Sequence, residues 1–398
     1  MASSDHSAIP SVLGYQYQTN WGLYELLRNR VSRPDHALTL EMFDDVAWDA
    51  DGRPTDLLQL KLHVNATGTL GNSSDDIWRT MGVWIDNGRP RDPLGPALSL
   101  ITNSVASSGS AAFLLRDDDA RDTSAALMML ESAARTSTNE ATAKSRAKFM
   151  KLTPSERFTF VDRIYVVDGS PDLEDIDDRV REVLWAAMPL GRENAYMDLV
   201  WRWWGRVAVD MLRGRRPAIT VPELATQLDA IRDMFTADNL PTVIELADVD
   251  KDAVLVNLAD RTFVKQMMWV GIGPVNLRAA VIDYYRAYSQ TTTWLDRHIV
   301  GLSELERFED NLRDEWERAF ENMCEALSAD ATNEDKQAAG KQLLQHLTES
   351  TLTVRSRYTD QFYARGKRHE LADRGQVGWH PEFLKHLEEL LTPAAATS

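Results

Sequence analysis

Residues 38–63 read LTLEMFDDVAWDADGRPTDLLQLKLH, and they decide how the first half of the chain is expected to fold. Residues 49–54, DADGRP, favour turns and separate two runs of strand-forming residues. Side chains alternate between the two faces of a strand, so one face of the second run is apolar and the other polar. The polar face carries Gln59, Lys61 and His63. We therefore predict a β-hairpin that presents an amide, an ammonium and an imidazole together.

The same alternation in the first run places acidic groups on the polar side of the hairpin. Glu41 lies on that side, and Asp45 joins it if the alternation continues, whereas Asp44 points inward or lies at a bend. Carboxylate and amide oxygens suit a hard cation such as Mg²⁺ or Mn²⁺, and a lysine can orient water or stabilise a pentavalent phosphate. We predict that Glu41, Asp45 and Gln59 bind the metal, and that Lys61 completes a phosphodiester-cleaving site.

A helix is predicted before the hairpin, in the sequence GYQYQTNWGLYELLRNR that begins at Gly14. Its aromatic and aliphatic residues recur every three to four positions, with Gln18 and Glu25 on another face, where they are expected to support the site. His63 has two interpretations, a contact to the phosphate or metal shell and a structural hydrogen bond. Residues 64–74 are small and polar and are expected to form a loop near the active face. An ordinary hairpin with solvated charges is the alternative for the whole motif.

The acid followed at a distance by Gln-x-Lys resembles the PD-(D/E)xK signature of restriction-endonuclease-like enzymes, in the variant where glutamine replaces the middle acid. Residues 10–170 also contain Gly-Tyr-x-Tyr-Gln, Glu-x-x-Asp-Asp-Val, Leu-Gln-x-Lys-x-His and Asp-Ile-Trp-Arg-Thr. In these motifs the chain is similar to the double-stranded-DNA endonuclease domain of CBASS effectors and Lamassu nuclease subunits. The resemblance implies an α/β restriction-endonuclease-like domain. Its metal and catalytic positions correspond to Glu41, Asp45, Gln59 and Lys61.

The net charge of −17 argues against a protein that coats nucleic acid by itself, because non-specific DNA affinity comes mainly from cationic side chains. The densest basic run of the first half comprises Lys144, Arg146, Lys148 and Lys151. This run is a candidate contact to the DNA backbone, although a solvated helix face is the commoner explanation. We expect one chain to bind DNA weakly, so that either several subunits assemble around the duplex or a partner delivers it.

Length and composition predict two folded domains. A chain of 398 residues exceeds the usual size of one domain, and 43% hydrophobic with 26% charged residues is an ordinary globular balance. Residues 1–170 are expected to form the α/β domain. Residues 171–398, in which almost every segment has helical periodicity, are expected to form a mainly α-helical domain. The segment Asp-Gly-Ser-Pro at 168–171 is the predicted linker.

The cellular location is predicted from cysteine usage and from the hydropathy of the chain. The single cysteine, Cys324, lies in an amphipathic helical pattern and is expected to be buried. Without a second cysteine there is no internal disulfide, which suits a reducing cytoplasm. The first residues lack a basic region followed by an apolar run, and no stretch approaches the roughly eighteen apolar residues of a membrane span. These features predict a soluble cytoplasmic protein that does not enter a membrane.

The last part of the chain contains YARGKRHELAD at residues 363–373 and Gly-Trp-His-Pro at residues 378–381. With these motifs, residues 172–392 resemble the domain that recurs in ABC-three-component defence systems. The resemblance implies attachment to an SMC-type ABC ATPase and to a small third subunit. His380 invites a catalytic or metal-binding interpretation, but a histidine without nearby ligands is more often structural. The scattered histidines do not predict a structural zinc site.

Together these observations predict a cytoplasmic anti-phage effector, in which a magnesium-dependent DNA endonuclease is fused to a helical docking domain. Resemblance to Lamassu nuclease subunits implies that the ATPase restrains the nuclease until foreign DNA is sensed, and that nuclease subunits then form a homo-oligomer. The alternative is a non-catalytic adaptor whose degenerate nuclease fold links the ATPase complex to DNA or to another effector. A nuclease activated by a cyclic nucleotide is less favoured, because the helical half resembles a partner-docking domain. The chain lacks a phosphate-binding Gly-x-x-x-x-Gly-Lys-Ser/Thr loop, so it is not itself the ATPase.

Overall fold

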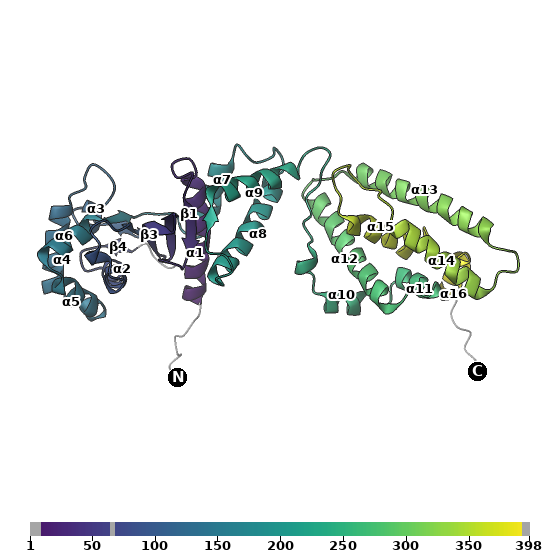
Figure 1. The fold of residues 1–398 in the computed structure, drawn as a ribbon, viewed down its shortest axis with the longest axis horizontal. Helices are drawn as coiled ribbons and strands as arrows, with labels where there is room; N and C mark the ends of the chain where they lie inside the picture. Colours follow the sequence, from purple (N-terminus) through teal and green to yellow (C-terminus); the bar gives the residue numbers. More distant parts are fainter. Residues whose placement is uncertain (1–8, 64–67, 392–398) are drawn as a thin grey trace, which may run out of the picture. The chain divides into compact units, whose positions relative to one another are not determined.

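A computed structural model describes residues 9–63 and 68–391 of the chain (Figure 1). The chain divides into two compact units. The first consists of residues 1–188 and 200–229, and the second of residues 189–199 and 230–398. Among the described residues, strands occur only in the first unit, and the second is helical, as the sequence predicts for the two halves of the chain.

Within the described residues, a mixed six-stranded sheet lies at the centre of the first unit, with strand order β7-β5-β3-β2-β1-β8. Strand β3 pairs antiparallel with β2 and parallel with β5, which pairs parallel with β7. The strands are β1 (Ala37–Leu40), β2 (Val46–Ala50), β3 (Arg53–Lys61), β5 (Ala97–Thr102), β7 (Ile164–Val167) and β8 (Ile219–Thr220). A separate two-stranded sheet pairs β4 (Thr69–Leu70) with β6 (Val105–Ala106). It follows residues 64–67, the part of the predicted loop that lies outside the described residues.

The predicted hairpin is confirmed at β2 and β3, but the prediction of one strand before its turn is wrong. Strand β1 ends at Leu40 because Glu41 adopts a left-handed backbone conformation with φ of 53°. The chain then turns back, and the Glu41 amide donates to the carbonyl of Asp45 at 3.2 Å. At the hairpin turn, Gly52 has φ of 80°, a conformation that glycine adopts without strain. The first run therefore forms two antiparallel strands, and the predicted acids lie in the connection between them.

Helices pack against the sheet to complete the first unit. They are α1 (Ile9–Arg28), α2 (Asp75–Asp86), α3 (Ala111–Leu114), α4 (Thr123–Thr136), α5 (Ala143–Lys151), α6 (Pro154–Asp162), α7 (Asp175–Leu184), α8 (Glu193–Leu212, from Val200 onward) and α9 (Val221–Asp233, up to Asp229). Two short 3₁₀ helices, η1 (Arg89–Arg91) and η2 (Glu140–Thr142), connect them. Trp78 and Trp84 of α2 are fully buried. Thr153 and Glu156 form a capping box at the start of α6, and β7 follows the end of this helix.

The boundary predicted near residue 170 falls inside the first unit, because the chain beyond it returns to α1. The Tyr17 hydroxyl donates to the carbonyl of Pro171 at 3.0 Å, and the Trp204 indole donates to the carbonyl of Thr19 at 2.7 Å. A side chain at Gly22 would place its Cβ 3.1 Å from the Trp204 ring, so the glycine permits this close approach. Strand β8 also pairs with β1. Residues 172–188 and 200–229 thus complete the α/β unit.

The second unit is built from helices (Figure 1). They are α10 (Lys251–Leu258), α11 (Thr262–Trp269), α12 (Pro274–Asp296), α13 (Leu302–Ala326), α14 (Asn333–Thr348), α15 (Gln361–Asp373) and α16 (Phe383–Leu391), with the 3₁₀ helix η3 (Leu246–Asp248) before them. Its core includes the buried rings of Trp294, Trp316 and Trp379. Cys324 is exposed on the charged helix α13, so the prediction that it is buried is wrong. No helix in the described ranges combines the length and apolar character needed to cross a bilayer.

Candidate active site

Asp45 is the centre of the predicted metal site. Its Oδ2 accepts a hydrogen bond from the backbone amide of Leu60 at 2.8 Å and another from the side-chain amide of Gln59. Asp45 and Gln59 are both buried. Lys61 lies two residues after Gln59 in β3, on the same face of the strand. The structure therefore brings together an acid, an amide and a lysine that are separated in sequence.

Opposing interactions act on the pKa of the Asp45 carboxyl. Burial raises the pKa of its carboxyl above the ordinary value. The Leu60 amide hydrogen bond, the positive charge of Lys61 and the side-chain amides of Gln18 and Gln59 oppose this effect. A carboxylate in such a position is costly to ionise without a cation, and this is the condition in which a bound metal ion stabilises the site.

The Asp44 side chain points inward, and its backbone lies at a bend. The sequence predicted one or the other of these features, and the structure shows both. Its Oδ2 accepts from the Trp84 indole at 2.7 Å, and its Oδ1 accepts from the Asp45 amide at 3.0 Å. Burial, partly opposed by the Trp84 bond, raises its pKa to about 6. Nothing in the spacing of two residues this far apart indicates their hydrogen bond.

Glu41 lies in the connection between β1 and β2, and its side chain is exposed. Partial burial of its carboxyl raises its pKa, and the charges of Asp45 and Asp44 add to that effect. The three acids therefore repel one another. In the described part of the chain, their oxygens do not all come within 4.8 Å of one another. They form an acidic patch that a cation has to draw together, rather than a preformed three-carboxylate site.

Whether a divalent cation fits beside Asp45 depends on the side-chain oxygens of Gln18 and Gln59. The side-chain amide of Gln18 on α1 bonds to Asp45, and its Oε1 is buried without a hydrogen-bond partner among the described residues. An unpaired buried oxygen beside a buried carboxylate is a suitable ligand for a hard cation. Gln59 presently directs Nε2 toward Asp45, so its amide has to turn before Oε1 can bind the same ion. The donor set fits Mg²⁺ or Mn²⁺ after this rotation.

Glu25 makes its side-chain hydrogen bonds to residues other than the predicted metal ligands, and its supporting role at the metal site stays a prediction. Its Oε1 accepts from the Trp48 indole at 2.9 Å and from Asn29 at 2.8 Å. Its Oε2 accepts from Arg28 at 2.8 Å. Both oxygens are therefore engaged in holding the end of α1 against β2. Helical spacing placed Glu25 near Gln18 on one face, but the indole of Trp48 determines where this carboxylate lies.

His63 makes hydrogen bonds of the structural kind, which is one of the two interpretations that the sequence left open. Its Nε2 lies 2.6 Å from Oδ2 of Asp76 at the start of α2. Its backbone exchanges hydrogen bonds with the Asn103 side chain, at 3.0 Å through the amide and 2.9 Å through the carbonyl. These bonds join the end of β3 to α2 and to the segment after β5.

The predicted DNA-contact residues separate into two kinds. Arg146 is buried, and its guanidinium donates to the carbonyls of Ser137 and Asn139, each at 2.7 Å, so it is structural and unavailable to DNA. Lys148 pairs with Asp86 at 2.6 Å. Lys144 and Lys151 are exposed. Two of the four side chains thus remain as candidate phosphate contacts.

Part of the second unit is similar to a known family of domains. Residues 263–387 match the family model of C-terminal domain 7 of the ABC-three component (ABC-3C) systems. The matched segment extends from α11 to α16 and begins well after residue 172, where the sequence resemblance was placed. It indicates a role in a defence-type system that has partner subunits. No curated protein and no solved structure is significantly similar to the chain.

Proposed function

We propose that this chain is the effector of an ABC-three-component defence system and that its first unit cleaves double-stranded DNA by metal-dependent phosphodiester hydrolysis. The surroundings of Asp45 carry this proposal. Its carboxylate accepts hydrogen bonds from Gln59 and from the backbone of β3, and its pKa responds to the charge of Lys61. An acid, an amide and a lysine in this relation are what a PD-(D/E)xK-like site requires.

Each residue has a distinct role in the proposed reaction. Asp45 and Glu41, with the amide oxygens of Gln18 and Gln59, are expected to hold Mg²⁺ or Mn²⁺. When bound, the cation supplies Lewis acidity to the scissile phosphate and lowers the pKa of a water molecule. The Lys61 ammonium orients the attacking water or stabilises the charge that develops on the phosphate. Asp44 holds the acidic connection against α2 through Trp84.

In this proposal, the helical unit compensates for the weak DNA affinity of an acidic chain. With a net charge of −17, isolated chains are expected to bind the duplex weakly. We propose that the ABC-three-component domain attaches the chain to an SMC-type ABC ATPase and a small third subunit, which restrain the nuclease. Sensing of foreign DNA then allows nuclease subunits to assemble into an active homo-oligomer. A cytoplasmic location is part of this proposal.

The test is cleavage of supercoiled plasmid by the full chain, alone and with its partner subunits, in Mg²⁺ or Mn²⁺. Lys61→Ala and Asp45→Asn are expected to abolish cleavage while leaving the circular dichroism spectrum unchanged. Lys251→Ala and Asp119→Asn, which alter exposed residues of the same types, serve as matched controls and are expected to cleave normally. Cleavage that persists in both site variants would remove the assigned site.

A second candidate function is a non-catalytic adaptor that links the ATPase complex to DNA. One observation favours it: Gln59 donates to Asp45 instead of offering its oxygen, and the acids are not gathered into a three-ligand group in the described residues. Calorimetric titration with Mn²⁺ separates the two candidates. A nuclease is expected to bind the ion with an affinity that Asp45→Asn reduces, whereas an adaptor shows no such difference.

A further inference from the structure

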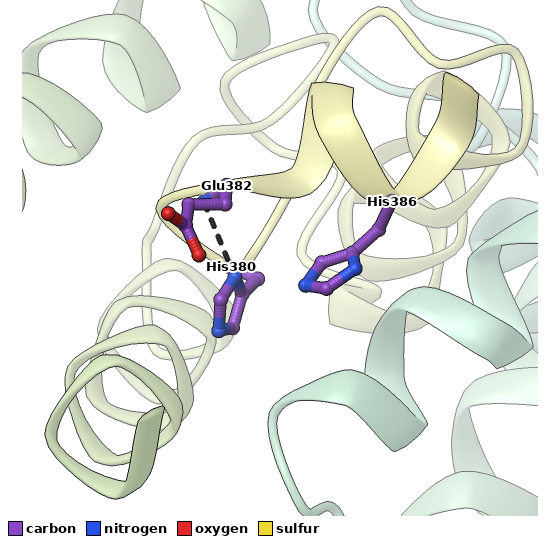
Figure 2. Close-up of side chains that lie close together, drawn as sticks. All are labelled: His380, Glu382 and His386. Atoms are coloured by element: carbon purple, nitrogen blue, oxygen red, sulfur yellow. Dashed lines mark hydrogen bonds between the residues drawn. The ribbon is translucent and has the colours of Figure 1, made fainter. Parts of the chain in front are cut away.

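Two imidazoles and one carboxylate meet near the end of the second unit (Figure 2). His380 belongs to the segment that precedes α16, Glu382 follows it by two residues, and His386 lies on α16 itself. One ligand atom from each residue lies within 4.8 Å of the other two. Figure 2 shows the His386 ring extending from the helix toward His380, with the Glu382 carboxylate on the other side of the His380 ring.

The surrounding structure fixes the two rings. His380 is only 1% exposed, and its Nδ1 accepts from the Glu382 amide at 3.1 Å (Figure 2). Its Nε2 has no hydrogen-bond partner among the residues that the structure describes. The ring centres of His380 and His386 are 4.9 Å apart, and Trp269 packs on His386 at the same centroid distance. Because Nδ1 accepts, the proton of the neutral ring lies on Nε2, and this buried N–H is a polar group without compensation.

Further contacts orient the other two donors. Nδ1 of His386 lies 3.3 Å from Oε2 of Glu389, which leaves Nε2 of this ring as the free lone pair. Metal-binding histidines commonly give their second nitrogen to a carboxylate in this way. Glu382 pairs through Oε1 with Lys336 at 3.0 Å, so its other oxygen can bind a cation. The cluster therefore has partners of the kind that surround metal ligands.

We propose that His380, Glu382 and His386 bind a divalent transition-metal ion, with Zn²⁺ as the expected ion and water at the open position. Two imidazoles and a carboxylate are a common ligand set for Zn²⁺, whereas Mg²⁺ prefers oxygen ligands. Ligand bonds of roughly 2.0–2.2 Å require the donors to approach one another more closely. The partly exposed side chains of Glu382 and His386 can rotate to do this.

Binding also changes the hydrogen bonding of His380. The ion either replaces the Glu382 amide at Nδ1 or takes Nε2 after the ring proton moves to Nδ1. In both cases it joins the Gly378–Pro381 segment to α16. The segment and the ligand-bearing turn of α16 lie within the matched ABC-three-component domain, so the ion acts there as a structural clip. The proposal does not depend on nuclease activity in the first unit.

The test is titration of the full chain, stripped of metal with a chelator, first with Co²⁺ and then with Zn²⁺. Co²⁺ is expected to produce visible absorption bands from a nitrogen-containing site, and one equivalent of Zn²⁺ is expected to displace it. His386→Gln and Glu382→Gln are expected to remove this binding. Glu389→Gln is expected to weaken it by about 10- to 100-fold, as for other outer partners of metal ligands.

His346→Gln, an exposed histidine on α14, is the matched control and is expected to bind as the unaltered chain does. His380 is left unchanged because a buried substitution can disturb folding. A Zn²⁺ affinity that His386→Gln and Glu382→Gln leave unchanged, or no displacement of Co²⁺ by Zn²⁺ in the unaltered chain, overturns the proposal. Excess Mg²⁺ is expected not to compete, which keeps this site distinct from the acidic patch of the first unit.

Discussion

Gln59 in strand β3 donates its side-chain amide to the carboxylate of Asp45, the residue that precedes strand β2. This bond joins the two strands at the point where the predicted catalytic groups meet. It also holds a buried carboxylate whose pKa is raised by its surroundings. A cation that binds both side chains has to replace this hydrogen bond, because Gln59 must turn its amide before its oxygen can reach the same ion as Asp45.

A cation that binds the acidic patch is expected to stabilise the first unit. The pKa values of Glu41, Asp44 and Asp45 are all raised, so their negative charges oppose folding near pH 7. Millimolar Mg²⁺ or Mn²⁺ should therefore raise the melting temperature of this unit, since a ligand that binds only the folded state adds stability. Asp45→Asn should abolish most of the shift, and Asp119→Asn should preserve it. Differential scanning fluorimetry measures both, and equal shifts in the two variants would contradict the assigned ligand.

The basic run of α5 should divide into structural and DNA-binding residues. Arg146→Ala removes a buried guanidinium that donates to the Ser137 and Asn139 carbonyls, and it is expected to cost about 2–4 kcal/mol of unfolding free energy. Lys151→Ala alters an exposed side chain and should change stability by less than about 0.5 kcal/mol. Urea denaturation measures the stability of both variants. The contribution of Lys151 to DNA binding is measured with the assembled complex at several salt concentrations. The slope of log affinity against log salt is expected to fall by about one for each lost phosphate contact.

The second unit should lose stability in mild acid through His369. Burial, with a smaller effect from the charges of Arg368 and Arg365, lowers its pKa from 6.5 to about 3. Between pH 6.5 and about pH 3, His369 is protonated in the unfolded chain but not in the folded chain. The free energy of unfolding is therefore highest above pH 6.5 and decreases as the pH falls toward 3. At pH 5 the expected loss is about 2 kcal/mol. Urea midpoints between pH 7 and pH 5 test this, and His369→Gln should show a smaller decrease than His346→Gln.

The sequence predicts those features of the first unit that depend on local patterns. Alternation placed Gln59 and Lys61 on one face of a strand, and the turn-forming residues 49–54 located the hairpin turn between β2 and β3. The break after Leu40 was missed because it depends on a left-handed conformation at Glu41, which non-glycine residues rarely adopt and no propensity signals. An uninterrupted strand was the natural expectation for that run.

Long-range contacts explain the other differences. The hydrogen bond from the Trp204 indole to the Thr19 carbonyl joins residues beyond the predicted linker to the first unit, and helical periodicity contains no information about where a helix returns. Trp48 similarly determines the position of Glu25. The ligand cluster of His380 and His386 depends on the path of the chain into α16, so counting scattered histidines could not identify it.

Gly366 should be the least replaceable glycine at the contact between α12 and α15. A Cβ at this position would lie 2.2 Å from the carbonyl oxygen of Asp283 and 2.5 Å from Cβ of Ala287, so the two helices would have to separate. Gly366→Ala is expected to cost about 3 kcal/mol or more, at the upper end for overpacking, because a rigid backbone atom is in the way. Gly205→Ala in α8 is the matched control: nothing lies within 4 Å of its Cβ, and alanine there should add about 1 kcal/mol. Urea unfolding of both variants compares the two, and a Gly366→Ala chain as stable as the unaltered protein would show that the helices can move apart without loss.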